Sequence, residues 1–188
     1  MKKSKLSELN FMALCCILGL FTKKLINPFA NIITEALHIP GGVSTGFSIM
    51  FLVIAAEIVQ RKYSGTLMAT VQGLLALALG RVGSMGFLMP LAYISTGIAI
   101  DLIYSIQKYV KLSRTERMAF ANALAAIMAS IVANTLVFRL SGPVLWLYLC
   151  VSATSGILYG FLGASVIARL YPILQSIDSN GGINHEIT

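Results

Sequence analysis

Six apolar stretches, separated by short polar hinges, fill almost the whole chain. They cover residues 9–26, 43–60, 65–80, 87–107, 117–139 and 143–170. Because the hydrocarbon core of a bilayer requires about 20 mainly apolar residues in a helix, each stretch predicts one membrane-spanning helix. The pattern therefore predicts an all-α integral membrane protein, built as a single bundle of six transmembrane helices.

The hinges predict where these helices begin and end. Ser113, with Glu116 three residues later, has the pattern of a capping box for the fifth helix. Pro143 stands near the first position of the sixth helix, where proline is favoured. The longest connection, residues 26–42, has room for a short interfacial helix over residues 30–37, ended by a Pro-Gly-Gly turn.

Composition agrees with a membrane protein of one domain. Of the 188 residues, 57% are hydrophobic and 11% are charged, whereas soluble domains carry about 25% charged residues. Residues 1–174 are expected to form the transmembrane domain, and residues 175–188 a polar cytoplasmic tail that is predicted to be disordered. The first apolar stretch lacks a cleavage site of small residues, so we expect it to remain as a helix rather than act as a signal peptide.

The net charge of +7 predicts an orientation in the membrane rather than a nucleic-acid partner, because the basic residues lie at the hinges. With the N-terminus inside, ten of the 14 lysines and arginines are cytoplasmic: Lys2, Lys3, Lys5, Arg61, Lys62, Lys108, Lys111, Arg114, Arg117 and Arg169. The other four are Lys23, Lys24, Arg81 and Arg139. Both termini are therefore expected in the cytoplasm. Lys23 and Lys24 can extend to the outer membrane surface.

Catalytic and energy-converting groups are scarce. The two histidines, His38 and His185, fall in the first outer connection and the tail, and no G-x-S-x-G or pair of carboxylates at helical spacing occurs. We therefore expect neither an enzyme nor a cofactor or metal site. No G-x-x-x-x-G-K-[ST] loop is present, so energy for uphill transport would have to come from a partner or a coupled ion.

Two acidic residues lie inside apolar stretches, near their cytoplasmic ends. Glu57 and Asp101 are interpreted as interface anchors or as partners of Arg61 or Lys108. The alternatives are an intramembrane salt bridge and a contact that responds to a partner protein.

Small residues recur every four positions in two helices. They are Ala121, Ala125, Ala129 and Ala133 in the fifth helix, and Ser152, Gly156, Gly160, Ala164 and Ala168 in the sixth. Such ridges allow close helix packing in lipid. They indicate either packing within the bundle or a docking surface for another membrane subunit.

Polar and aromatic side chains gather in the outer halves of the last four helices and in the loop after the third. The candidate ligand-binding residues are Gln72, Arg81, Ser84, Tyr93, Thr96, Ser130, Asn134, Arg139, Trp146, Tyr148 and Ser152. Polar side chains in a membrane are costly unless they face the interior, so their convergence predicts an outward-facing pocket. Asn134 and Gln72 are the strongest individual candidates, because a buried amide needs partners. Trp146 and Tyr148 are equally typical of an interfacial aromatic belt.

The chain resembles the substrate-binding S component of energy-coupling-factor (ECF) transporters over residues 6–172. The resemblance lies in six short helices, the run Ile39-Pro40-Gly41-Gly42 before the second helix, Gly65-Thr66-Leu67 opening the third, and the Gly-rich loop after Gly80. It implies a subunit of the bacterial plasma membrane that captures a vitamin or related micronutrient from outside. Its implied partners are a transmembrane coupling subunit and two cytoplasmic ATPase subunits.

The resemblance also bears on the ligand and on the docking face. The Pro-Gly-Gly entry and the third helix look most like members that handle thiamin precursors or cobalamin. Family members often dock through small residues on the first helix; here Ala13 is followed four residues later by Ile17, so Cys15 and Gly19 form the nearest such pair. A stand-alone channel or facilitator is the alternative function, and an intramembrane enzyme a third reading.

Overall fold

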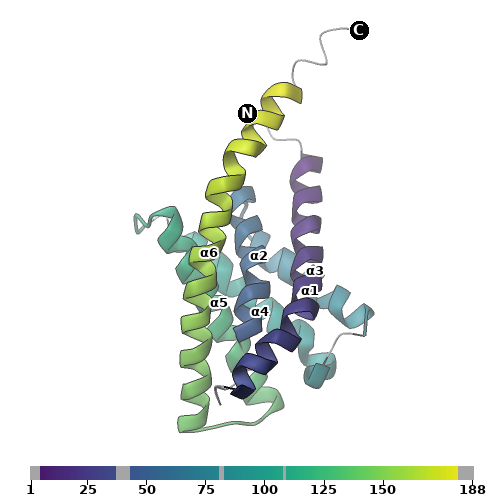
Figure 1. Cartoon of the computed structure of the whole chain (residues 1–188), viewed down its shortest axis with the longest axis vertical. Helices are drawn as coiled ribbons and strands as arrows, with labels where there is room; N and C mark the ends of the chain where they lie inside the picture. Colours follow the sequence, from purple (N-terminus) through teal and green to yellow (C-terminus); the bar gives the residue numbers. More distant parts are fainter. Residues whose placement is uncertain (1–4, 37–42, 81–82, 108, 182–188) are drawn as a thin grey trace.

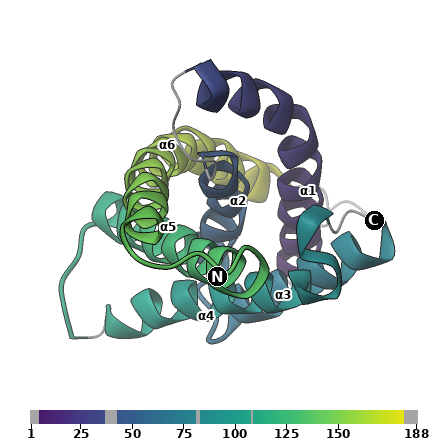
Figure 2. The same cartoon turned by 90° about the horizontal axis from the view of Figure 1, so that it is seen from below.

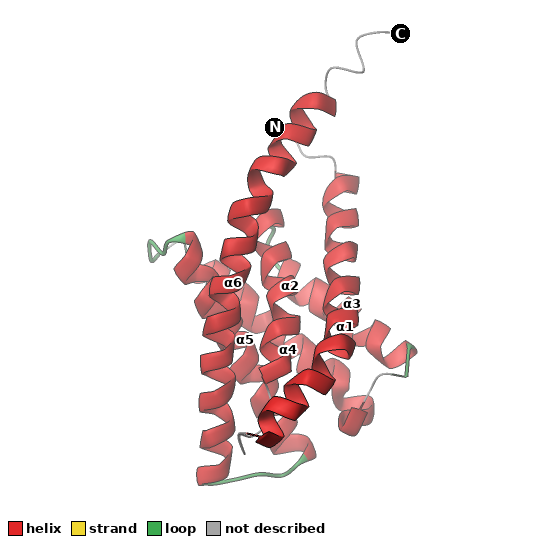
Figure 3. Ribbon diagram, viewed as in Figure 1, coloured by secondary structure: helices red, strands yellow, loops and turns green. Residues whose placement is uncertain are grey.

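The computed structural model describes residues 5–36, 43–80, 83–107 and 109–181, and these residues are almost entirely helical (Figure 3). The six α-helices are α1 (Lys5–Ala36), α2 (Val43–Val59), α3 (Ser64–Ala78), α4 (Met89–Ile106), α5 (Arg114–Val132) and α6 (Pro143–Gly181). A short 3-10 helix, η1 (Gly83–Leu88), precedes α4, and a π-helical segment, η2 (Ala133–Val137), extends α5. The all-α class is confirmed, and so is one helix for each apolar stretch.

Three of the helical segments are long and apolar enough to cross a membrane: Met85–Ile106, Arg114–Val137 and Pro143–Leu170. The other three apolar segments are shorter: Leu9–Lys23, Ser44–Val59 and Ser64–Ala78. Figure 1 shows the start of α1 and the end of α6 at the same end of the bundle. We call this the upper end, as drawn there, and the opposite end, where α2 and α6 begin, the lower end.

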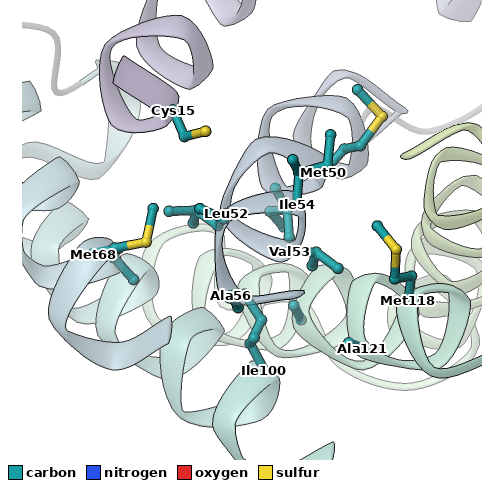
Figure 4. Packing of buried hydrophobic residues seen from close by; sticks show 14 of the residues in the cluster. Cys15, Met50, Leu52, Val53, Ile54, Ala56, Met68, Ile100, Met118 and Ala121 are labelled. Atoms are coloured by element: carbon teal, nitrogen blue, oxygen red, sulfur yellow. The ribbon is translucent and has the colours of Figure 1, made fainter. Parts of the chain in front are cut away.

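Helix α2 lies at the centre of the bundle and contacts each of the other five α-helices (Figure 2). Its apolar residues face every direction, as is typical of a helix that is buried all round. Figure 4 shows Leu52, Val53 and Ile54 of α2 surrounded by side chains from the neighbouring helices. These neighbours include Cys15, Met68, Ile100, Met118 and Ala121.

Helices α5 and α6 pack with their backbones in close approach. A Cβ atom added at Gly156 would lie 2.6 Å from the Cα of Ala123, and one added at Gly160 would overlap Ala119. Ser152, Gly156, Gly160 and Ala164 are buried, whereas Ala168 is exposed. The small-residue ridge of the sixth helix therefore packs within the bundle.

The expected connection after the first helix is wrong, because α1 continues through most of it. The helix continues through Asn27 and Pro28 to Ala36 and bends in its lower half, where a long interruption with a separate short helix was expected (Figure 1). Proline removes one intrahelical hydrogen bond and crowds the preceding turn, which kinks a helix without having to end it. The Pro-Gly-Gly turn, residues 40–42, lies outside the described residues.

Helix α6 is longer than expected. It runs on to Gly181, so residues 175–181 are helical where a disordered tail was predicted. Adding residues to an existing helix is far less costly than starting one, so a polar segment can extend an apolar helix. Residues 182–188 lie outside the described residues.

Polar contacts at the upper end fix the helix termini. Ser113 and Glu116 form the predicted capping box, in which the Glu116 N–H donates to Ser113 Oγ at 3.3 Å and the Ser113 N–H to Glu116 Oε2 at 2.9 Å. Asp101 of α4 caps α3 from a neighbouring helix. Its carboxylate accepts hydrogen bonds from the N–H groups of Gly65 at 2.9 Å and Thr66 at 2.8 Å. Asp101 is thus a tertiary helix cap, a role that was not among those expected for it.

Glu57 is one half of a buried ion pair. Arg117 of α5 donates to its carboxylate from Nε at 2.9 Å and also from Nη2. The Tyr104 hydroxyl donates to the same carboxylate at 2.9 Å, and Arg114 Nε lies 3.5 Å away. Glu57 therefore forms a salt bridge between helices, with Arg117 as its main partner, and its place within the membrane stays a prediction.

Candidate functional site

A cavity of about 300 Å³ lies in the lower half of the bundle, between α1, α2, α4, α5 and α6. Its wall is formed by α1 near its bend, by the first turns of α2, α4 and α6, and by the end of α5. The cavity and the Glu57–Arg117 pair therefore lie at opposite ends of the bundle. The lining residues are Lys23, Thr45, Ser48, Ile49, Met85, Met89, Ala92, Tyr93, Thr96, Ala126, Ala129, Ser130, Ala133, Asn134, Phe138, Tyr148 and Ser152. Of the lining residues that the structure describes, none comes from α3.

Six of the candidate ligand-binding residues meet in this cavity. They are Tyr93, Thr96, Ser130, Asn134, Tyr148 and Ser152. They come from α4, from α5 with its extension η2, and from α6. The structure therefore brings together the predicted polar sets of the fourth, fifth and sixth helices.

The remaining candidates lie elsewhere. Gln72 is 1% exposed and does not line the cavity; its Nε2 donates to the backbone carbonyl of Cys16 at 3.2 Å, which ties α3 to α1. Arg139 is exposed, and Trp146 is 69% exposed on the outside of α6. Arg81 and the side chain of Ser84 lie outside the described part of the structure.

Asn134 owes its position to the π-helical segment η2. A π turn inserts an extra residue into the helical spacing and shifts the faces of the residues that follow, and such turns are frequent at functional sites. Here the side chain of Asn134 is buried, and its Nδ2 donates to Ser130 Oγ at 2.9 Å. The segment is closed by a bond from the Leu140 N–H to the Asn134 carbonyl at 2.9 Å.

Several hydroxyl groups of the lining donate to their own helices. Thr96 Oγ1 donates to the Ala92 carbonyl at 2.7 Å, and Ser48 Oγ donates to the Thr45 carbonyl at 2.9 Å. A hydroxyl that has donated its proton still accepts hydrogen bonds, so these groups present acceptors to the cavity. Tyr93 also lines the cavity, and its buried hydroxyl has no hydrogen-bond partner among the described residues.

Sequence reasoning missed the contributions of the first two helices. Lys23 was expected to extend to the membrane surface, but its ammonium group lies 5.6 Å from the centroid of the Tyr93 ring, in the cavity wall. Thr45 and Ser48, three positions apart at the start of α2, were not singled out. Their spacing places both on one face of a helix, which was the available signal.

The expected docking residues of α1 separate into two groups. Cys15 and Gly19 are buried, and a Cβ atom at Gly19 would overlap the Gln72 amide. Ala13 is exposed. Cys15 and Gly19 therefore pack against neighbouring helices of the same chain, and only Ala13 of the three lies on the outer surface.

Comparison with known proteins adds no relative: no protein-family model, curated protein or solved structure matches the chain. Within the described residues, no three His, Cys, Asp or Glu side chains gather where they could hold a metal ion. The chemistry of the site is therefore that of hydroxyls, one amide, aromatic rings and one ammonium group, arranged around a mainly apolar space.

Proposed function

We propose that this protein is the membrane-embedded solute-capture subunit of an ATP-driven importer of the ECF type, situated in a bacterial plasma membrane. The observation that carries the proposal is the cavity, in which polar side chains from α1, α2, α4, α5 and α6 converge at one end of an otherwise apolar bundle. Small-molecule sites have this character: a concave, mainly apolar space with a few placed polar groups.

All six helices cross the bilayer in this proposal, with both termini in the cytoplasm and the cavity facing outward. The bias of ten basic residues against four supports this orientation. The start of α1 and the end of α6 at one end of the bundle agree with an even number of crossings. The shorter helices α2 and α3 would then span with local thinning of the bilayer or with the help of their polar ends.

The packing above the cavity favours capture over free passage. Val53, Ala125 and Ile100 are fully buried in the core between the cavity and the upper end, and the Glu57–Arg117 pair lies beyond them. A channel or facilitator needs a continuous polar path, whereas a capture subunit needs a site that is closed on one side. Release to the cytoplasm would then depend on a transmembrane coupling subunit and two ATPase subunits.

The volume of the cavity limits the size of the ligand. About 300 Å³ is at the small end of the range of roughly 300–1,000 Å³ for small-molecule sites. A ligand of the size of a thiamin precursor fits this space better than one as large as cobalamin.

Binding and flux measurements test the proposal. The purified protein in detergent or nanodiscs should bind one B-vitamin or vitamin precursor with submicromolar affinity by calorimetry, and coexpression should yield a complex with a coupling subunit and ATPases. In liposomes, the protein alone should give no solute flux. Flux through the isolated protein would favour the channel or facilitator, and a screen without any ligand or partner would contradict a capture subunit.

A further inference from the structure

Among the described residues of the cavity wall, Lys23 is the one with an ionisable basic side chain. It lies at the end of the apolar part of α1, yet its ammonium group faces the Tyr93 ring at 5.6 Å, inside the lining. Among the lining residues that the structure describes there is no aspartate or glutamate, so no carboxylate balances it. The described lining therefore contains one basic side chain and no acidic one.

A partly buried ammonium group without a counter-ion is costly to maintain. The face of the Tyr93 ring offsets a part of this cost through a cation–π contact. The same ring carries a buried hydroxyl without a hydrogen-bond partner among the described residues. On the α1–α4 side of the cavity, the Lys23 ammonium group and the Tyr93 hydroxyl thus both lack an acceptor among the described residues.

We propose that the ligand is a small acid, with a carboxylate that pairs with Lys23 and accepts a hydrogen bond from Tyr93. This inference rests on the proposed capture function and names its substrate class. A monoanion balances the single ammonium group, whereas a phosphate ester would bring a second, unpaired charge. The positive charge of Lys23 also disfavours a cationic ligand.

The rest of the lining indicates a ring-bearing acid. The α5–α6 side presents Ser130, Asn134 and Ser152, which can bond ring heteroatoms, and the aromatic side chains of Phe138 and Tyr148. Aromatic side chains stack on planar groups. A carboxylate at the Lys23 side and a ring at the opposite side would use both walls of the cavity.

Matched acid and amide pairs test the substrate class, because they differ in charge and hardly in shape. We would measure the binding of nicotinate and nicotinamide, biotin and biotinamide, and lipoate and lipoamide to the full-length protein by calorimetry. At least one acid should bind about 10- to 100-fold more tightly than its amide, the range of a charge-assisted hydrogen bond. Lys23→Gln should remove this preference, and Lys23→Arg should keep most of it.

The controls separate charge from folding. Lys111→Gln removes one positive charge from an exposed position in the hinge between α4 and α5 and should leave the preference unchanged. Thermal unfolding of each variant shows whether it remains folded. Tyr93→Phe keeps the ring and removes the hydroxyl, so it should weaken the binding of the acid and leave the binding of the amide unchanged.

Three outcomes would overturn the inference. An amide that binds as tightly as its acid, or an acid that binds Lys23→Gln as tightly as the wild type, contradicts the pairing while a capture function still stands. Binding of uncharged vitamins in the wider screen, with none of the three acids bound, does the same. A folded protein that binds no compound in either set contradicts both the ligand class and the capture function.

Discussion

Arg117 and Glu57, 60 residues apart in sequence, form a buried ion pair at the upper end of the bundle, with Arg117 Nε 2.9 Å from Glu57 Oε2. Both side chains are almost fully removed from solvent. The pair joins α5 to the central helix α2, and Tyr104 of α4 adds a hydrogen bond to the same carboxylate. Three helices are therefore held together at one carboxylate.

Removing one partner of this pair should destabilise the protein strongly. Glu57→Gln leaves the Arg117 guanidinium buried without its counter-ion, which typically lowers the free energy of unfolding by about 3–5 kcal/mol. Thermal unfolding of the purified protein in detergent measures the loss. The double variant Glu57→Met/Arg117→Met should recover a large part of it, because an apolar pair leaves no unpaired charge. A double variant as unstable as the single one would contradict this account.

Gly160→Ala should destabilise the bundle, although the same change usually favours a helix. A methyl group there would overlap the backbone of Ala119, so α5 and α6 would have to separate. Overpacking of this kind costs about 1–3 kcal/mol. Ser165→Ala, on the exposed face of the same helix, is the matched control and should leave the unfolding temperature almost unchanged. Equal unfolding temperatures for the two variants would show that the close contact is unimportant.

Alanine substitutions at Asn134 and Gln72 should affect different properties, ligand affinity in the first case and stability in the second. Asn134 lines the cavity, so Asn134→Ala should lower the affinity for the ligand found in the vitamin screen by about tenfold or more. This is the effect of losing a hydrogen bond in a closed site. Gln72 bonds the Cys16 carbonyl away from the cavity, so Gln72→Ala should lower stability by about 1–3 kcal/mol and leave ligand affinity unchanged. Calorimetry and thermal unfolding on both variants give the comparison. The reverse pattern would place the site at Gln72 instead.

Single cysteines test the orientation in the membrane. In a Cys150→Ala background, which removes the exposed native thiol, Ser141→Cys should react with a membrane-impermeant maleimide on intact cells. Val110→Cys, in the hinge between α4 and α5, should react only after the membrane is permeabilised. Cys15 and Cys16 are buried and serve as an internal background. If Val110→Cys, and not Ser141→Cys, were labelled on intact cells, the protein would have the opposite topology.

The helices and half of the site could be predicted from the sequence because a single physical rule governs both. An apolar stretch of sufficient length forms a helix, and a polar group within it must face other polar groups. This rule places Ser130 and Asn134 together with Tyr93 and Ser152, all of which line the cavity. The capping box of α5 was also predictable, because it depends only on Ser113 and on Glu116 three residues later.

The remaining parts of the site depend on contacts between distant segments. Gln72 meets its need for a partner at the backbone of Cys16, and nothing in the local pattern distinguishes that partner from a ligand. Lys23 has an alkyl chain long enough to reach either the membrane surface or the interior, and the position of Tyr93 decides which. The π-helical segment at Asn134 has no local sequence signature, so its effect on the direction of that side chain could not be predicted.

Helix α3 takes no part in the described lining, although it belongs to the same bundle. Its outward residues Leu67, Leu74 and Leu75 are exposed, while its inward face is occupied by Met68, Gln72 and Ala76. Substitutions in the helices around the cavity would therefore change its shape and chemistry, and substitutions on the outer face of α3 would change only the surface that this helix presents to its surroundings. Either surface can change in evolution while the other is kept, so the lining of the cavity and the outer face of α3 are free to diverge at separate rates.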